Sequence, residues 1–189
     1  MYAEEKALRR VHRAGLEAAL NALSINRKYP RAIAYANTTY FGLELTDYAV
    51  SQGLAQMDLY VGHSRRGDRT GQLLQIEREY MELVIGKGKC PLAHPEITNA
   101  SYVDETWILL LGKFLHKCGG RIVTDSKPVM RKQRKNDEFI MTLAENLSKS
   151  TQLKIQQCRL YLNVALLSDI CTSEGDKLEE GYLSGRKVR

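Results

Sequence analysis

Long hydrophobic runs are missing from this sequence of 189 residues. Trp107–Leu111 is among its longest uninterrupted apolar stretches, far shorter than the roughly 20 residues that span a bilayer. The N-terminal residues Met1–Lys6 hold neither an apolar core nor a small-residue cleavage site, which argues against a secretory signal. We therefore expect no membrane partner and an intracellular location, either cytoplasmic or nuclear.

Cysteine is also scarce, with four residues, and none of them forms a Cys-x-x-Cys pair. In a chain without a secretory signal, the four indicate free, mostly buried thiols and no disulfide framework. Cys90, His94, His116 and Cys118 nevertheless offer the ligand types of a structural zinc site. Their spacing matches no known zinc knuckle, and His116 and Cys118 would point about 200° apart on a helix. We favour a buried Cys118 and a surface His116, with no metal and no cofactor, and keep a zinc-stapled module as an alternative.

Motifs that carry catalysis are absent as well. The sequence contains no His-Glu-x-x-His, no Gly-x-Ser-x-Gly and no adjacent aspartates after an aromatic residue that would hold two Mg²⁺ ions. Gly86–Lys89 has the glycines of a phosphate-binding loop without the Lys-Ser or Lys-Thr that must follow, and it comes after a helical pattern instead of a strand. We expect no catalytic residues and no enzyme activity from this chain alone.

Basic residues, by contrast, are in excess. Lys and Arg number 28 against 22 Asp and Glu, which gives a formal net charge of +6. This balance permits a nucleic-acid partner without requiring one. Hydrophobic residues make up 43% of the chain, so it can also bury a core of its own.

The apolar residues recur mostly at helical spacing, which predicts a mainly α protein. We expect a compact bundle of about six helices with at most one short strand, at Arg121–Asp125. The last helix also alternates as a strand would from Cys158 to Leu166, but its length favours a helix. The expected helices cover residues 3–23, a short segment ending at Ala36, a segment after Thr46, residues 72–85, a segment after Asp104, a segment after Asn136 and residues 151–167.

Polar residues before the apolar runs predict where these helices begin. Thr46, Asp104 and Asn136 are the expected N-caps, and either Asp68 or Thr70 caps the helix over 72–85. Gly119–Gly120 supplies the left-handed residue on which the helix after Asp104 ends.

Domain organisation follows from the same pattern. We expect a single helical domain over residues 1–172, with the helix over 3–23 loosely attached, and a flexible tail over 173–189. The helix that carries Trp107 and Phe114 is apolar nearly all round, so we expect it at the centre of the core with both aromatic rings buried.

Several segments match, in order, the landmarks of one protein family. They are Asn26-Arg-Lys-Tyr-Pro-Arg31, Gly42-Leu-Glu-Leu-Thr-Asp47, Gln52-Gly53, Gly71–Ile76, Trp107 with Phe114-Leu115, and Cys158–Gly175. Together they resemble the region that follows the palm in the reverse transcriptases of eukaryotic retroelements, which reads Asn-Arg-x-x-Pro-Arg, Gly-Gly-x-Gly-Leu-x-Asp and Glu-Gln-Gly. Phe41 and Ser51 depart from that pattern, because they stand where the family tends to have Gly and Glu. The catalytic aspartates of the family lie upstream of these landmarks, and nothing in this chain matches them.

The resemblance implies a thumb-like or connection-like region that supports the template–primer duplex and lacks the polymerase active site. Such a support contacts phosphates and not base edges, because it must accept every sequence. Lys and Arg side chains neutralise phosphates and release their counterions. The candidate nucleic-acid-binding residues are Arg27, Lys28, Arg31, Arg65, Arg66, Arg69, Lys127, Arg131, Lys132, Arg134 and Lys135. The expected partners are an RNA or DNA phosphate backbone and the rest of a polymerase.

Other interpretations stay open. Each candidate cation is equally a solvated surface charge, and we interpret the stripe Lys6, Arg9, Arg10 and Arg13 in that way. Arg159 lies in an apolar segment and is expected to pair with Asp169 or with a helix end. The broad apolar arc over residues 73–85 motivates an alternative function, a helical scaffold that docks onto a polymerase or another protein.

Overall fold

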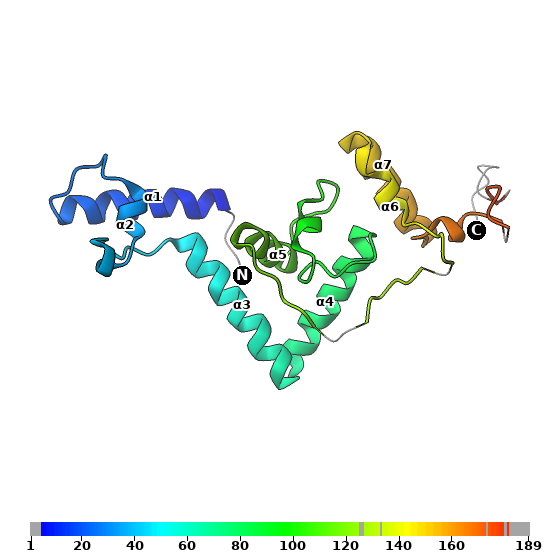
Figure 1. Cartoon of the computed structure of the whole chain (residues 1–189), viewed down its shortest axis with the longest axis horizontal. Helices are drawn as coiled ribbons and strands as arrows, with labels where there is room; N and C mark the ends of the chain where they lie inside the picture. Colours follow the sequence, from blue (N-terminus) through cyan, green and yellow to red (C-terminus); the bar gives the residue numbers. More distant parts are fainter. Residues whose placement is uncertain (1–4, 125–126, 133, 173, 180, 182–189) are drawn as a thin grey trace. The chain divides into compact units, whose positions relative to one another are not determined.

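The computed structural model describes residues 5–124, 127–132, 134–172, 174–179 and 181 (Figure 1). In this part of the chain seven α-helices and four short 3-10 helices make up the regular structure, and no strand occurs. The α-helices are α1 (Glu5–Ala22), α2 (Arg31–Tyr35), α3 (Tyr48–Arg66), α4 (Arg69–Ile85), α5 (Trp107–Cys118), α6 (Ile140–Leu143) and α7 (Lys149–Leu162). The 3-10 helices are η1 (Thr38–Tyr40), η2 (Pro95–Asn99), η3 (Ala144–Asn146) and η4 (Leu167–Asp169). The mainly α fold expected from the sequence is confirmed.

The short strand expected at Arg121–Asp125 is wrong for the residues that the structure describes. Arg121–Thr124 is irregular chain, in which the Ile122 amide donates to the Leu92 carbonyl at 2.9 Å. Asp125 lies outside the described residues. A segment that pairs with a loop instead of another extended segment has no ladder to join, so its β-branched residues do not make it a strand.

Contacts divide the chain into two compact units, the N-terminal unit (Met1–Gly62) and the C-terminal unit (His63–Arg189). The boundary falls inside α3, where the sequence gives no linker signal. The expected single domain over residues 1–172 and the loose attachment of helix 3–23 stay predictions. Of the expected flexible tail, residues 173, 180 and 182–189 lie outside the described residues.

The N-terminal unit has a small core between α1 and α2. Leu16 and Leu20 of α1 are buried against Ala34 of α2. After η1 the chain returns along α2, because the amides of Leu43 and Leu45 donate to the carbonyls of Ile33 and Ala34 at 3.3 and 2.9 Å.

The same return leads into α3. The carboxylate of Asp47 accepts from the Ala49 amide at 2.8 Å, so Asp47 caps α3 and the expected cap at Thr46 is wrong. Thr and Asp are both good N-caps, so the position at which the incoming segment meets the helix decides which of the two neighbouring residues caps it.

The C-terminal unit is built on α4 and α5. Asp68 caps α4 by accepting from the Gly71 amide at 2.9 Å, as expected. Thr106 caps α5 at 3.4 Å, so the expectation of Asp104 is wrong. Gly119 ends α5 with a φ of 67°, as predicted. No helix among the described residues combines the length and the apolar character needed to cross a bilayer.

Helix α5 does supply the centre of this core, but with different residues from those expected. Ile108, Leu109 and Leu111 are at most 1% exposed, whereas Trp107 and Phe114 are only half-buried. The two aromatic residues lie at the margin of the face that packs on α4 and η2, because the aliphatic residues occupy its middle. The expectation that both rings are fully buried is wrong.

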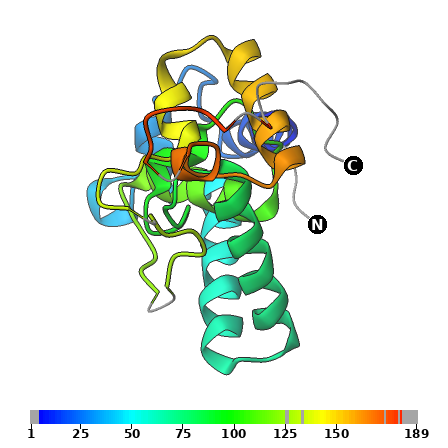
Figure 2. The same cartoon turned by 90° about the vertical axis from the view of Figure 1, so that its right-hand side faces the viewer.

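The α6 region differs from the expected helix. Helix α6 has one turn and begins after Phe139, so Asn136 does not cap it. Phe139 instead forms an antiparallel bridge with Leu166, and the Ile140 amide donates to the Ala165 carbonyl at 3.0 Å. The chain after α7 thus returns beside α6 (Figures 1 and 2). Tertiary pairing has replaced a longer local helix.

Helix α7 confirms the choice of helix over strand but ends before residue 167. Asn163 terminates it in the left-handed conformation, with a φ of 56°. Beyond it Val164 and Leu166 are buried, so the alternating pattern that looked strand-like belongs to the returning segment. Arg159 does not pair with Asp169. It binds a helix end, the second expected alternative, by donating to the Val84 carbonyl of α4 at 2.8 Å.

Candidate nucleic-acid interface

The most basic segment of the chain covers residues 127–135, and we call it the basic loop; its described residues, 127–132, 134 and 135, form no helix or strand. Its five cationic side chains in the described residues are all exposed. They are Lys127, Arg131, Lys132, Arg134 and Lys135. Sequence reasoning predicted these cations but not what holds the loop that carries them.

A buried carboxylate anchors the first half of the basic loop. Glu82 of α4 is fully buried, and its Oε1 accepts from the Val129 amide at 2.8 Å. Arg78, one turn earlier on α4 and 1% exposed, places its Nη1 3.8 Å from the other Glu82 oxygen. The cation offsets the charge of the buried carboxylate, and the backbone bond fixes the loop to the core.

A second buried carboxylate anchors the other end. Asp137 is 4% exposed and accepts from the Ser168 hydroxyl at 2.6 Å and from the Ser168 amide at 3.1 Å. The basic loop is therefore fixed to α4 near its beginning and to η4 just beyond its end. Anchors of this kind reduce the conformational entropy that ordering a loop on a ligand would cost.

The cations of the basic loop differ in what they contact. Lys132 forms an ion pair with Glu138 at 3.0 Å, and Arg134 donates to the Thr172 carbonyl at 3.4 Å. Lys127, Arg131 and Lys135 have no ion pair with any residue that the structure describes. Three unpaired cations on a short, anchored loop form a surface suited to anions.

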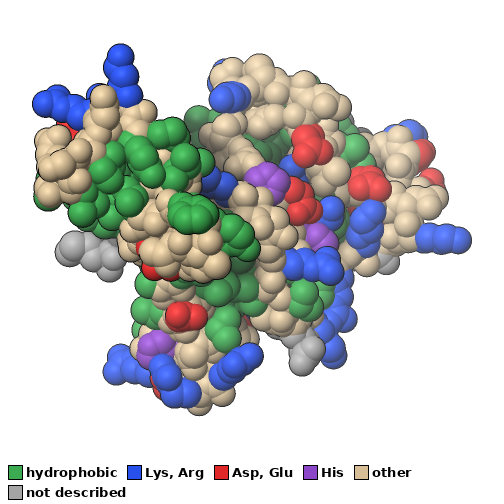
Figure 3. All heavy atoms as spheres, turned by 60° about the vertical axis from the view of Figure 1, so that its left-hand side comes forward, with side chains coloured by type: hydrophobic (Ala, Val, Ile, Leu, Met, Phe, Trp, Pro, Cys, Tyr) green, Lys and Arg blue, Asp and Glu red, His purple; other side chains and the backbone are tan. Residues whose placement is uncertain are grey.

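A second basic group lies at the turn from α3 to α4, where Arg65, Arg66 and Arg69 are exposed. Arg66 pairs with Asp68 at 3.2 Å, and His63 lies 2.7 Å from the same carboxylate. The Gly71 amide first, then the His63 hydrogen bond, lower the pKa of Asp68 to about 2. At the bottom of the view in Figure 3, cationic side chains (blue) and a histidine (purple) lie together on the surface.

Gly71 makes this turn tight. A Cβ at Gly71 would overlap the His63 carbonyl, so the two helix ends approach more closely than any larger residue allows. Arg65 and Arg69 have no ion pair within the described residues. The turn therefore displays two unpaired cations and one that is already neutralised by Asp68.

The third predicted group, Arg27, Lys28 and Arg31, belongs to the N-terminal unit. All three are exposed, in the turn between α1 and α2 and at the start of α2. The Lys28 amide donates to the Asn26 side chain at 2.9 Å, which shapes this turn before Pro30. The candidate residues thus lie in three exposed groups, each local in the sequence, and their role in binding stays a prediction.

The thiols contradict one expectation. The four cysteines are free, as expected, but Cys118 and Cys158 are exposed and Cys90 and Cys171 are half-buried, so "mostly buried" is wrong. In the described part of the chain no three His, Cys, Asp or Glu side chains lie close enough to share a metal ion. Since Cys90, His94, His116 and Cys118 are all described, the structure does not assemble the zinc set.

Two buried acids and their partners were missed by sequence reasoning. Glu82 stands inside the apolar arc of α4, between Met81 and Leu83, and that position is the signal that it is buried. Asp137 has no comparable signal, because its burial depends on Ser168 arriving from 31 residues later. Comparison with protein-family models, with curated proteins and with solved structures found no match to this chain.

Proposed function

We propose that this chain binds the phosphate backbone of RNA or DNA without reading its sequence, through the basic loop and the turn from α3 to α4. The proposal includes the resemblance stated above: an accessory region like the part of a retroelement reverse transcriptase that follows the palm, which leaves polymerisation to residues outside this chain. The observation that carries it is the anchoring of the basic loop by Glu82 and Asp137 while Lys127, Arg131 and Lys135 face solvent.

The anchored basic loop is preorganised for binding. A free basic tail binds phosphates but must lose its own entropy in doing so, whereas an anchored loop has lost part of it on folding. The contacts available are cation to phosphate, and these set position and affinity without distinguishing bases.

Charge reversal tests the proposal. The variant Lys127→Glu/Arg131→Glu/Lys135→Glu should weaken binding to all RNA and DNA sequences alike and make the slope of log K against log salt shallower by about 3. The matched control Lys117→Glu/Lys149→Glu/Lys154→Glu reverses three exposed lysines of the same unit, so its net charge is identical. Equal losses in the two variants would reduce the effect to net charge and contradict a site on the basic loop. Primer extension by the purified chain would contradict an accessory role.

A specific observation also favours the alternative, a helical scaffold for a protein partner. On α4 the apolar arc divides: Leu74, Met81, Val84 and Ile85 are buried, while a second row is exposed. The exposed row is Leu73, Ile76, Tyr80 and Leu83, at 58, 61, 58 and 38%. This spacing of three and four residues places the row on one helix face. Ile76→Ser/Tyr80→Ser, which adds no charge, should leave nucleic-acid binding unchanged and abolish binding to any protein that docks on this row.

A further inference from the structure

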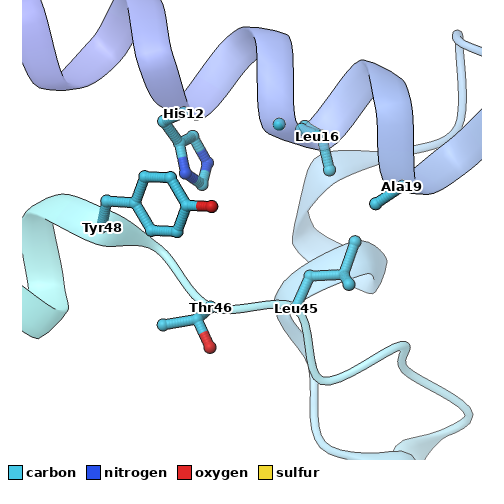
Figure 4. A pocket seen from close by; sticks show the side chains of 7 residues that line it. His12, Leu16, Ala19, Leu45, Thr46 and Tyr48 are labelled. Carbon is cyan, nitrogen blue, oxygen red and sulfur yellow. The ribbon is translucent and has the colours of Figure 1, made fainter.

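A cavity of about 210 Å³ lies in the N-terminal unit, between α1 and the segment that leads into α3 (Figure 4). Figure 4 shows its two sides: His12 and Tyr48 lie together on one side, and Leu16, Ala19 and Leu45 lie on the other. Thr46 completes the lining between them. The cavity therefore has a wall with polar groups facing a wall of aliphatic carbon, which is the composition of many small-ligand sites.

The polar wall contains groups that the fold does not use. His12 Nε2 hydrogen-bonds the Tyr35 hydroxyl, but His12 Nδ1 is buried and has no partner among the described residues. The Tyr48 hydroxyl likewise makes no hydrogen bond to a described residue, and in Figure 4 it points toward the middle of the cavity. His12 Nδ1 has no accessible surface and does not border the open space of the cavity, so the Tyr48 hydroxyl is the free polar group that a ligand there can reach.

The rings of the polar wall are fixed in place. The imidazole of His12 and the phenol of Tyr48 meet edge to face, with centroids 5.1 Å apart and planes at 80°. Gly15 leaves room for this arrangement, because a Cβ there would lie 3.2 Å from the Tyr48 hydroxyl oxygen. The polar atoms are thus held ready for a ligand, without rearrangement of the two rings.

The size and chemistry of the cavity favour a single planar ring with a polar edge. An engineered apolar cavity of about 150 Å³ in another protein binds benzene, so one aromatic ring fits here with room for its substituents. Such a ring can pack on Leu16 and Leu45 while its edge bonds to the hydroxyls of Tyr48 and Thr46. Nucleobases have this form, and unpaired bases are bound in proteins by aromatic contact together with hydrogen bonds to their edges.

We propose that this cavity, the His12 pocket, holds one unstacked base of a single-stranded RNA or DNA. The inference rests on the proposed function and deepens it, because it names a single strand as a ligand in addition to the backbone. Arg31 is exposed and lies one turn before Tyr35, the partner of His12, on α2, so it provides a cation for the phosphates on either side of the base. A duplex keeps its bases stacked and has none to place in the pocket.

Filling the pocket is the sharpest test. Ala19→Leu places extra methyl groups in the cavity and keeps every polar group, while Ala18→Leu makes the same change at an exposed position on the same helix. With labelled single-stranded oligonucleotides, Ala19→Leu should bind about tenfold more weakly, because the base can no longer enter the cavity, and Ala18→Leu should bind as the parent chain does. Both variants should bind a duplex of the same length as the parent chain does.

A second variant covers the case in which Ala19→Leu does not fold. Tyr48→Phe removes only the hydroxyl and should weaken single-strand binding a few-fold while the helical circular dichroism stays unchanged. If both variants fold and bind single strands as tightly as the parent chain does, the pocket does not bind a base, and the proposal of backbone binding is unaffected. If the parent chain binds neither RNA nor DNA, the proposed function itself is wrong. A free nucleoside monophosphate that binds the parent chain as tightly as an oligonucleotide would also overturn the inference, because the ligand would then be a free nucleotide.

Discussion

The guanidinium carbon of Arg159 lies 2.7 Å from the position that a Cβ on Gly86 would occupy. Gly86 ends α4 with a φ of 69°, and the space left by its missing side chain admits the arginine from α7. Arg159 Nη2 then donates to the carbonyls of Leu83 and Val84 at 2.7 and 2.8 Å. These carbonyls have no partner within their own helix, so a residue from α7 completes the end of α4.

Replacing Gly86 with alanine should therefore destabilise the C-terminal unit by more than backbone strain alone. Gly119 is the matched control, because it ends α5 with a φ of 67° and has open space around it. We expect Gly119→Ala to lower the free energy of unfolding by about 1 kcal/mol, the cost of a left-handed alanine. Gly86→Ala should lower it by about 3 kcal/mol, since Arg159 must also give up its bonds to the carbonyls of Leu83 and Val84, of which only the Val84 carbonyl keeps a second donor, Gln156. Urea unfolding followed by circular dichroism measures both, and equal losses would contradict the role of Arg159.

Helix ends show how far the sequence predicts this fold. Gly119 was predicted correctly and Asp68 was one of two expected caps, because their effects are local: a carboxylate caps an amide three residues on, and a glycine adopts a positive φ. The caps at Thr46 and Asp104 were displaced by one or two residues, to Asp47 and Thr106, because neighbouring residues cap equally well. Packing chooses between them, and packing cannot be read from a single helix.

The candidate site, too, is only partly predictable from the sequence. Exposure of Arg131 and Lys135 follows from their charge, and the sequence is sufficient to predict it. The anchors of the basic loop depend instead on contacts between segments 47 residues apart, as for Val129 and Glu82. No period or spacing in the sequence encodes such a contact.

Tyr102 should make the stability of the C-terminal unit fall at alkaline pH. Its hydroxyl donates to the Ile85 carbonyl at 3.0 Å, and burial raises its pKa from 10.0 to about 12. Because the folded chain holds this proton more tightly than the unfolded chain, its contribution is complete below pH 10 and is lost as the pH rises through 12. Tyr102→Phe removes the group.

Urea midpoints at pH 8 and pH 11 measure the effect of Tyr102. The parent chain should lose more stability across this interval than Tyr102→Phe, and Tyr161→Phe, a change at a tyrosine that is 78% exposed, should behave as the parent. An identical decrease in the parent and in Tyr102→Phe would show that the buried hydroxyl does not control the alkaline limit.

Asp68 should make the stability of the C-terminal unit fall at acidic pH. Its pKa is lowered from 3.8 to about 2, first by the Gly71 amide and then by His63, so its stabilising contribution is complete above pH 3.8 and is lost as the pH falls through 2. Asp68→Asn keeps an acceptor for the cap and loses the charge. The difference in thermal midpoint between parent and variant should be largest near pH 5 and should shrink toward pH 2. Asp58→Asn, at an exposed residue of α3, should show no such convergence.

Ser168 separates the anchoring of the basic loop from its charge. Ser168→Ala removes the hydroxyl that donates to Asp137 at 2.6 Å and leaves every Lys and Arg in place. If preorganisation contributes to binding, RNA and DNA affinity should fall about fivefold, the size of one hydrogen bond's net contribution. The slope of log K against log salt should not change, because the number of phosphates contacted is the same.

Ser101→Ala, at an exposed serine of the same unit, serves as the control. A shallower slope in Ser168→Ala would instead mean that the loop has lost phosphate contacts, and an unchanged affinity would mean that the cations act without their anchor.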